Sequence, residues 1–183
     1  YTGRIKTDNG KTVYLMREIM ERLGDDYELH IFPGSFCINI NDELIQCSSR
    51  NINHLLQLRD IIFPNNRNII IHYPYEHKYG RKYLYYADCG IDFSPSRPNN
   101  EKSRAGNAKL LEYCSMGLPV VCETNTNNSY LVENAGNGIM LDGIGTSDQY
   151  VDAIQRLRSI NIDRRLSSEI TVNNNNWDLR AIE

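Results

Sequence analysis

The sequence predicts an α/β domain in which a parallel sheet lies between two layers of helices. Apolar segments of strand length alternate with segments of helical periodicity along most of the chain. Several boundaries between these segments carry glycine or proline. The 183 residues, 40% of them hydrophobic, suffice for one domain and not for two full ones. We therefore expect a single domain over residues 1–183.

The first strand and the first helix are predicted from residue composition and from the spacing of apolar residues. Residues 1–5 read as the end of a strand, and a polar turn follows. Residues 11–23 have helical spacing, with one apolar face formed by Val13, Met16, Ile19, Met20 and Leu23. Gly24 is expected to end this helix.

The next segment is less regular. Residues 27–32 predict a second strand that ends at Pro33-Gly34, and residues 36–47 fit neither pattern clearly. A helix is expected over residues 51–63, and the β-branched run at 68–73 predicts a strand.

The second half of the chain repeats the alternation. A tyrosine-rich helix is expected over residues 76–87, a short strand over 90–94, and a polar loop over 95–105. Residues 107–116 predict a helix that stops at Gly117-Leu-Pro119, the usual order for a helix end. The remaining predicted elements are strands at 120–122 and 138–141 and helices at 129–134, 147–160 and 164–172.

Charge and cysteine content exclude several classes of protein. Twenty basic and 23 acidic residues give a net charge of −3, which disfavours nucleic acid as a partner. No apolar run reaches the about 20 residues of a membrane span. The five cysteines are odd in number and form no CxxC pair, so we expect reduced thiols in a cytoplasmic protein and no metal site. His72 and His77 are five residues apart, and a structural role is favoured over metal ligation.

The start of the 107–116 helix is a candidate anion site. Asn107 is a favoured N-cap, its helix presents unpaired amides, and Gly106 lets a ligand approach the backbone. The segment around it carries a local excess of three positive charges, from Arg97, Lys102, Arg104 and Lys109 against Glu101. The alternative is that these cations are solvated side chains.

Glu112 is the second candidate in this helix. It lies four residues after Ala108 and therefore on the same face. Since helical side chains lean toward the N-terminus, its carboxylate could hold the vicinal hydroxyls of a ribose bound above the first turn. The alternative is an ordinary surface glutamate.

Residues 109–121 (KLLEYCSMGLPVV), with Gly138–Leu141 further on, resemble the donor-nucleotide-binding half of the group 1 (family 4) glycosyltransferases of GT-B fold. Tyr1-Thr-Gly3-Arg4 is similar to the opening strand of that half. The resemblance implies a Rossmann-like domain, the C-terminal half of such an enzyme, whose N-terminal acceptor domain is absent from this chain.

The resemblance also implies roles for individual residues. Glu112 would hold the ribose, and Arg104 occupies the place of the family's first glutamate, eight residues earlier. Gly3 and Arg4 match the family's Gly-Arg, whose arginine contacts the diphosphate. Lys11 is the nearest counterpart of the family's lysine, with Lys6 as the less favoured alternative. The amides of Gly106, Asn107, Ala108 and Lys109 would hold phosphate. Apart from the resemblance, Tyr73 or Tyr75 could line the base, because their loop also follows a predicted strand.

The implied reaction is metal-independent sugar transfer from a nucleotide-diphosphate sugar with retention, without a cofactor. Arg4 and Lys11 would stabilise the departing diphosphate as catalytic residues. The acceptor would be a saccharide or a lipid-linked sugar in polysaccharide biosynthesis, bound through the other domain, with the full-length protein cytoplasmic or peripheral to the membrane. Alone, the domain should transfer little or nothing.

Two other functions are weighed against this one. The first is a non-catalytic nucleotide- or protein-binding domain of Rossmann-like fold. The second is a P-loop at Gly10-Lys11-Thr12, which is disfavoured because Ile5 stands where that motif requires glycine.

Overall fold

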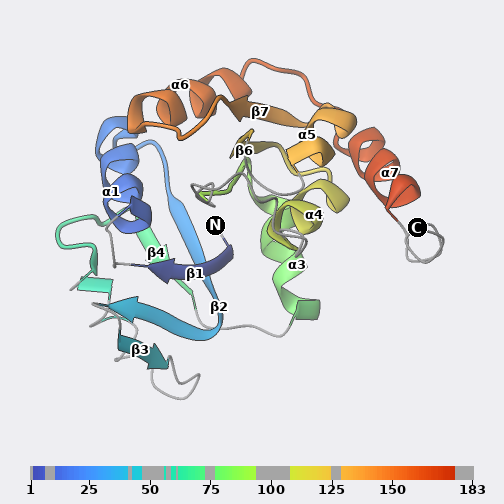
Figure 1. Ribbon diagram of the computed structural model, residues 1–183. Helices are drawn as coiled ribbons and strands as arrows, with labels where there is room; N and C mark the ends of the chain where they lie inside the picture. The colour runs from blue at the N-terminus through green and yellow to red at the C-terminus, as the bar shows by residue number, and fades with distance from the viewer. Residues whose placement is uncertain are drawn as a thin grey trace. The chain divides into compact units, whose positions relative to one another are not determined.

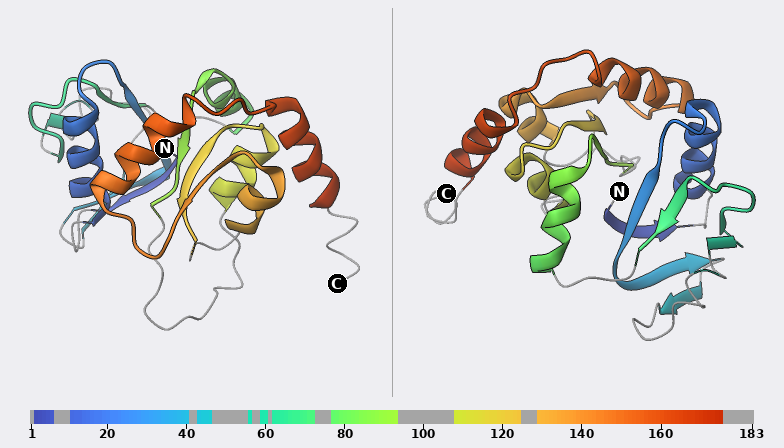
Figure 2. Two further views of the ribbon diagram at one scale, coloured as in Figure 1. Left: turned by 90° about the horizontal axis from the view of Figure 1, so that it is seen from above. Right: turned by 180° about the vertical axis from the view of Figure 1, so that it is seen from behind.

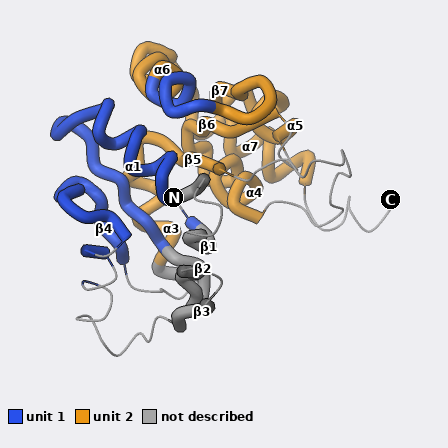
Figure 3. The backbone as a smooth tube through the Cα atoms, turned by 60° about the vertical axis from the view of Figure 1, so that its left-hand side comes forward, with its two compact units in different colours: residues 1–78, 146–151 blue, residues 79–145, 152–183 orange. Residues whose placement is uncertain are grey.

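The computed structural model describes residues 2–6, 11–40, 43–46, 56, 59–60, 62–72, 77–93, 108–124 and 129–175. The chain divides into two compact units (Figure 3). The first comprises Tyr1–Lys78 and Thr146–Val151, and the second comprises Tyr79–Gly145 and Asp152–Glu183.

The expected α/β fold with parallel strands is confirmed (Figure 1). The strands are β1 (Thr2–Lys6), β2 (Leu29–Ile40), β3 (Glu43–Gln46), β4 (Ile69–Ile71), β5 (Gly90–Ile91), β6 (Val120–Glu123) and β7 (Gly138–Leu141). The helices are α1 (Lys11–Leu23), α3 (His77–Tyr86), α4 (Ala108–Ser115), α5 (Ser129–Ala135), α6 (Ser147–Leu157) and α7 (Arg164–Asn174).

The sheet of the first unit is built around β2. This strand pairs in parallel with β1 and β4 and antiparallel with β3 (Figure 2). The predicted end at Phe32 is wrong, because β2 continues through Pro33 to Ile40. Pro33 lies where the pairing with β1 shifts register, between Gly3 and Ile5. A proline without an N–H is tolerated at such an irregularity of the ladder.

The core of the first unit comes from the predicted apolar face of α1 and from alternate strand residues. Val13, Met16, Ile19 and Met20 are buried, whereas Leu23 is only partly so. Gly24, at a φ of 75°, ends the helix as predicted, and its N–H donates to the Met20 carbonyl at 3.0 Å. The strand residues that alternate toward this core are Leu29 and Ile31 of β2 and Ile69 of β4, and Phe32 on the other face of β2 is also buried.

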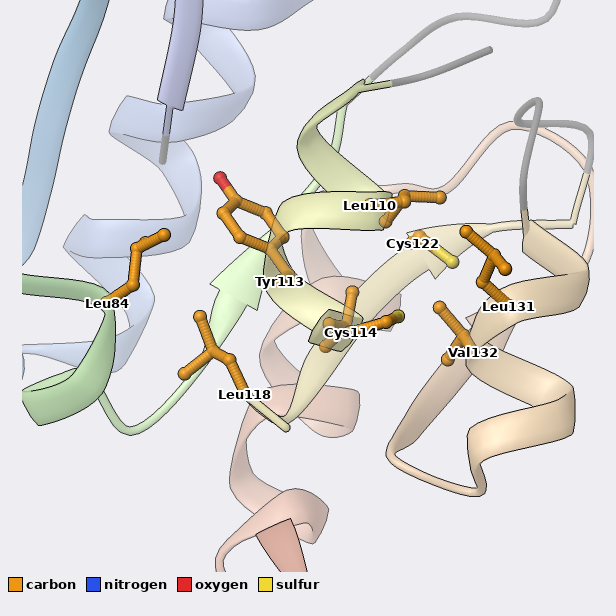
Figure 4. Close-up of a cluster of buried hydrophobic side chains, with 9 residues drawn as sticks. Leu84, Leu110, Tyr113, Cys114, Leu118, Cys122, Leu131 and Val132 are labelled. Atoms are coloured by element: carbon orange, nitrogen blue, oxygen red, sulfur yellow. The ribbon is translucent and has the colours of Figure 1, made fainter. Parts of the chain in front are cut away.

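In the second unit, β5, β6 and β7 form a parallel sheet in chain order. Helices α4 and α5 pack on this sheet, and α7 packs against both helices. Figure 4 shows Leu110 and Cys114 of α4 on the side of Leu131 and Val132, and Tyr113 on the side of Leu84. These side chains form one buried apolar cluster.

The thiols of the second unit are buried rather than bridged. Cys114 and Cys122 belong to the apolar cluster, and these two cysteines and Cys89 form no disulfide. Burial raises the pKa of Cys122 to about 12 and that of Cys114 to about 11. Both side chains are therefore neutral thiols near pH 7.

Two helix ends meet near the start of α7. Gly117, at a φ of 60°, ends α4 as predicted, and a Cβ at this position would overlap the backbone carbonyl of Arg164. The guanidinium of Arg164 donates at 3.2 Å to the carbonyls of Leu84 and Ala87, at the end of α3. These contacts satisfy carbonyls that a helix end leaves without partners inside the helix.

Candidate functional site

Acidic residues lie at the carboxyl ends of all three strands of the second sheet. Asp92 follows β5, Glu123 is the last residue of β6, and Asp142 follows β7. Asp92 and Glu123 are fully buried, at 0% exposure, and Asp142 is exposed. The carboxyl edge of a parallel sheet is where α/β folds bind ligands.

Asp92 anchors the first turn of α4. Its Oδ1 lies 2.8 Å from the Nζ of Lys109, whose side chain is 19% exposed. Lys109 is therefore mostly enclosed, and it is not the solvated cation of the alternative interpretation. A cation in the first turn opposes the helix dipole, and the Asp92 carboxylate offsets that cost from within the fold. The ion pair fixes the start of α4 next to the end of β5.

Helix α4 has an apolar face and a polar face. Leu110, Tyr113 and Cys114 are buried in the core. Lys109 and Glu112 are three residues apart and so share the other face. Glu112 is only partly buried. The helix therefore places Glu112 one turn after its exposed first residue, Ala108, and the ribose role of Glu112 stays a prediction.

The end of β6 orders the loop that follows β7. Glu123 Oε1 accepts a hydrogen bond from the N–H of Gly145 at 2.9 Å, and Thr124 Oγ1 accepts from the N–H of Gly143 at 3.3 Å. Sequence reasoning missed both residues. The sequence signal that could have identified Glu123 is its position as a carboxylate directly after the apolar run of residues 120–122.

Three of the predicted residues lie on elements of the first unit. Gly3 and Arg4 are in β1, and the register shift between Gly3 and Ile5 falls at Arg4. Lys11 is the first residue of α1. Irregular pairing of this kind is common next to binding sites, where it redirects a side chain.

The remaining predicted residues divide into two groups. Ala108, Lys109 and Glu112 share helix α4 in the second unit. Tyr73, Arg104, Gly106 and Asn107 lie outside the described residues. The structure thus places three predicted residues on one helix, and the roles of all the predicted residues stay predictions.

Neither a metal cluster nor a membrane helix is found in the part of the chain that the structure describes. No group of three or more histidine, cysteine or acidic residues is arranged to hold a metal ion within it. Within the same residues, no helix is long and apolar enough to cross a bilayer.

Comparison with protein-family models finds no match, and no curated protein matches the sequence. Solved structures do match. HepE of Anabaena, solved in complex with UDP, has a TM-score of 0.61 and 14% identity over 99% of this chain and 45% of that chain. The C-terminal domain of LpcC, a group 1 family glycosyl transferase of Francisella tularensis, has a TM-score of 0.52 and 16% identity over 100% and 85%.

A third match is WaaG, a glycosyltransferase involved in lipopolysaccharide biosynthesis, with a TM-score of 0.54 and 15% identity. The chain has a GT-B, Rossmann-like fold. The match to WaaG covers 97% of this chain but only 43% of WaaG. At these identities the similarity establishes the fold, and function has to be argued from the site.

Proposed function

We propose that the chain is the donor-nucleotide-binding half of a group 1 (family 4) type glycosyltransferase. The observation that carries the proposal is helix α4. Its KLLEY segment follows the carboxyl end of β5, its first turn is held by the Asp92–Lys109 pair, and Glu112 lies on the face opposite the core. The resemblance of this segment to the family and the GT-B fold support the same function.

The proposed binding mode assigns the nucleotide to α4. The Glu112 carboxylate accepts hydrogen bonds from the two ribose hydroxyls. The backbone amides at the start of the helix, from Gly106 to Lys109, receive the diphosphate, because a helix N-terminus favours negative charge. Asp92 acts as a positioning residue, since it fixes the turn that carries these amides.

The proposed chemistry is transfer of the sugar with retention and without a metal ion. Cleavage of the bond to the diphosphate leaves negative charge on the departing oxygen, and Arg4 and Lys11 supply fixed positive charge for it. The acceptor, a saccharide or a lipid-linked sugar, would bind through a second, N-terminal half. A cytoplasmic enzyme, free or peripheral to the membrane, fits the use of nucleotide sugars and the reduced thiols.

Calorimetric titration with UDP, GDP and ADP and their sugar conjugates tests this function. We expect saturable binding of one nucleotide class, with the diphosphate binding more tightly than the matching nucleoside. If none of these ligands binds at millimolar concentration, the proposal is wrong and the alternative, a non-catalytic domain that binds a protein partner, takes its place.

Glu112→Gln provides the residue-level test. An amide accepts the ribose hydroxyls less strongly than a carboxylate, so we expect affinity for the nucleotide to fall at least about tenfold. The matched control is Glu133→Gln on α5, where Glu133 is exposed to solvent and lies outside the proposed site. Equal affinities of the two variants would contradict the role given to Glu112.

A further inference from the structure

Two histidines of the first unit face each other across neighbouring parallel strands. His30 lies in β2, and His72 directly follows β4. The Nδ1 of His30 is 2.8 Å from the Nε2 of His72. The ring centroids are 5.0 Å apart, and the His72 ring also stacks on Phe32 at 4.2 Å. A hydrogen bond therefore joins the two rings, and these two nitrogens face each other across the neighbouring strands.

A carboxylate orients the first of these rings. Oε2 of Glu28 lies 3.1 Å from the Nε2 of His30, the nitrogen that faces away from His72. With its proton on Nε2 and donated to Glu28, the His30 ring presents the Nδ1 lone pair to His72. Metal-binding histidines commonly donate their second nitrogen to a carboxylate in this way.

The pair is accessible from solvent on the side of His30, whereas His72 is half-buried. The side chain of His30 is 41% exposed and that of Glu28 is 63% exposed. On the opposite side of the same strands, Leu29, Ile31 and Ile69 are buried. Because successive side chains of a strand point to opposite faces of the sheet, His30 and His72 lie on the face opposite Leu29, Ile31 and Ile69.

We propose that His30 and His72 form a two-histidine site for a divalent first-row transition cation such as Zn²⁺ or Cu²⁺, with Glu28 as a positioning residue. Two imidazole ligands on tetrahedral zinc lie about 3.3 Å apart, from bonds of about 2.0 to 2.1 Å. The observed 2.8 Å needs only a small opening of the two side chains.

Binding requires a defined tautomer of each ring. The cation replaces the hydrogen bond between the rings: His30 keeps its proton on Nε2, toward Glu28, and the proton of His72 moves from Nε2 to Nδ1, so that both facing nitrogens offer lone pairs to the cation. Water completes the coordination shell. Imidazole nitrogen favours zinc, copper and nickel, whereas Mg²⁺ and Ca²⁺ favour oxygen ligands. This inference does not depend on the proposed nucleotide site.

The first experiment uses the unmodified protein. Substoichiometric Cu²⁺ is added while the ring resonances of the four histidines are followed by NMR. We expect the signals of His30 and His72 to broaden first, before those of His54 and His77. Equal broadening of all four, or earlier broadening of His54 or His77, would overturn the proposal.

The second experiment measures Zn²⁺ affinity by calorimetry. We expect one zinc per chain, at least a tenfold loss of affinity in His30→Asn and in His72→Asn, and a smaller loss in Glu28→Gln. His54→Asn, which removes a different histidine, should bind zinc like the unmodified chain, and Mg²⁺ should give no heat. If His54→Asn loses as much affinity as His72→Asn, or if zinc does not bind, the site is refuted.

Discussion

At the residue scale, the Asp92–Lys109 ion pair is enclosed in the fold, and it also fixes the start of α4, where we propose that the nucleotide binds. Asp92 has no exposed surface, and its partner Lys109 is mostly enclosed. Removal of one partner from such a pair leaves a charge in a site that cannot hydrate it, which commonly costs about 3 to 5 kcal/mol. We expect Asp92→Asn to lower the free energy of unfolding by about 3 kcal/mol in urea titrations.

An exposed ion pair provides the matched control for this prediction. Asp152 lies 3.3 Å from Arg156 on α6, and both side chains are more than half exposed. The same substitution there, Asp152→Asn, should cost less than about 1 kcal/mol. Similar losses for the two variants would show that burial does not decide the strength of the Asp92–Lys109 pair.

Sequence reasoning found residues that share a helix and missed residues that meet across the fold. Glu112 and its neighbours could be placed because helical spacing fixes which residues share a face. The Asp92–Lys109 pair could not, because a polar loop of unknown path separates the two residues. His72 was weighed with His77, its neighbour in sequence, whereas its partner is His30, 42 residues away. Only the register of β2 with β4 brings those two rings together.

At the scale of elements, the two glycines that follow α4 and α5 allow two destabilising effects of an added side chain to be compared. One effect is the left-handed backbone conformation, and the other is steric overlap with a neighbouring helix. Gly117 and Gly136 both have a φ of 60°. A Cβ at Gly117 would overlap the carbonyl of Arg164, whereas no atom lies within 4 Å of the corresponding position at Gly136. Left-handed backbone costs an alanine about 1 to 2 kcal/mol.

We therefore expect Gly136→Ala to destabilise the protein by about 1 kcal/mol, from backbone conformation alone. Gly117→Ala should cost about 2 to 4 kcal/mol, because the start of α7 must also move. Thermal and urea unfolding of both variants measure the difference. If the two losses are equal, α7 does not pack against Gly117 in solution.

The bounds of elements were predictable where local signals were strong. Residues 11–23 and 138–141 were predicted with the bounds that α1 and β7 have, since an apolar face, a stop glycine or a compact apolar run marks each of them. The extension of β2 was not predictable, because Pro33-Gly34 is a normal strand terminator. The continuation of β2 depends on pairing with β1 and β3, and the local sequence around Pro33 does not disclose these pairings.

At the scale of the whole molecule, the alternation of strands and helices predicted the fold class but not the grouping of strands. The expectation was one parallel sheet. The described strands form a sheet around β2, with β3 antiparallel, and a second sheet of β5, β6 and β7. Periodicity identifies a strand, but it carries no information on which strands are neighbours.

The proposed roles of the two halves, donor binding by this chain and acceptor binding by a second half, give a prediction at this scale. The chain spans 43% of WaaG and 45% of HepE, so we expect it to bind donor while a second half supplies the acceptor. Sugar release from the donor identified by titration should be at background for the 183-residue chain and measurable for a protein that includes both halves. Turnover by the chain alone at the rate of the longer protein would contradict this division.

The contacts of Arg164 have a consequence for biosynthesis. A ribosome makes the chain from the N-terminus, and domains fold as their residues emerge. Helix α3 is therefore outside the ribosome well before Arg164, which lies 77 residues after Ala87, has been translated. Until then water must hydrate the carbonyls at the end of α3, and nascent chains that are stalled before this residue should be cleaved there by proteases to which the completed protein is resistant.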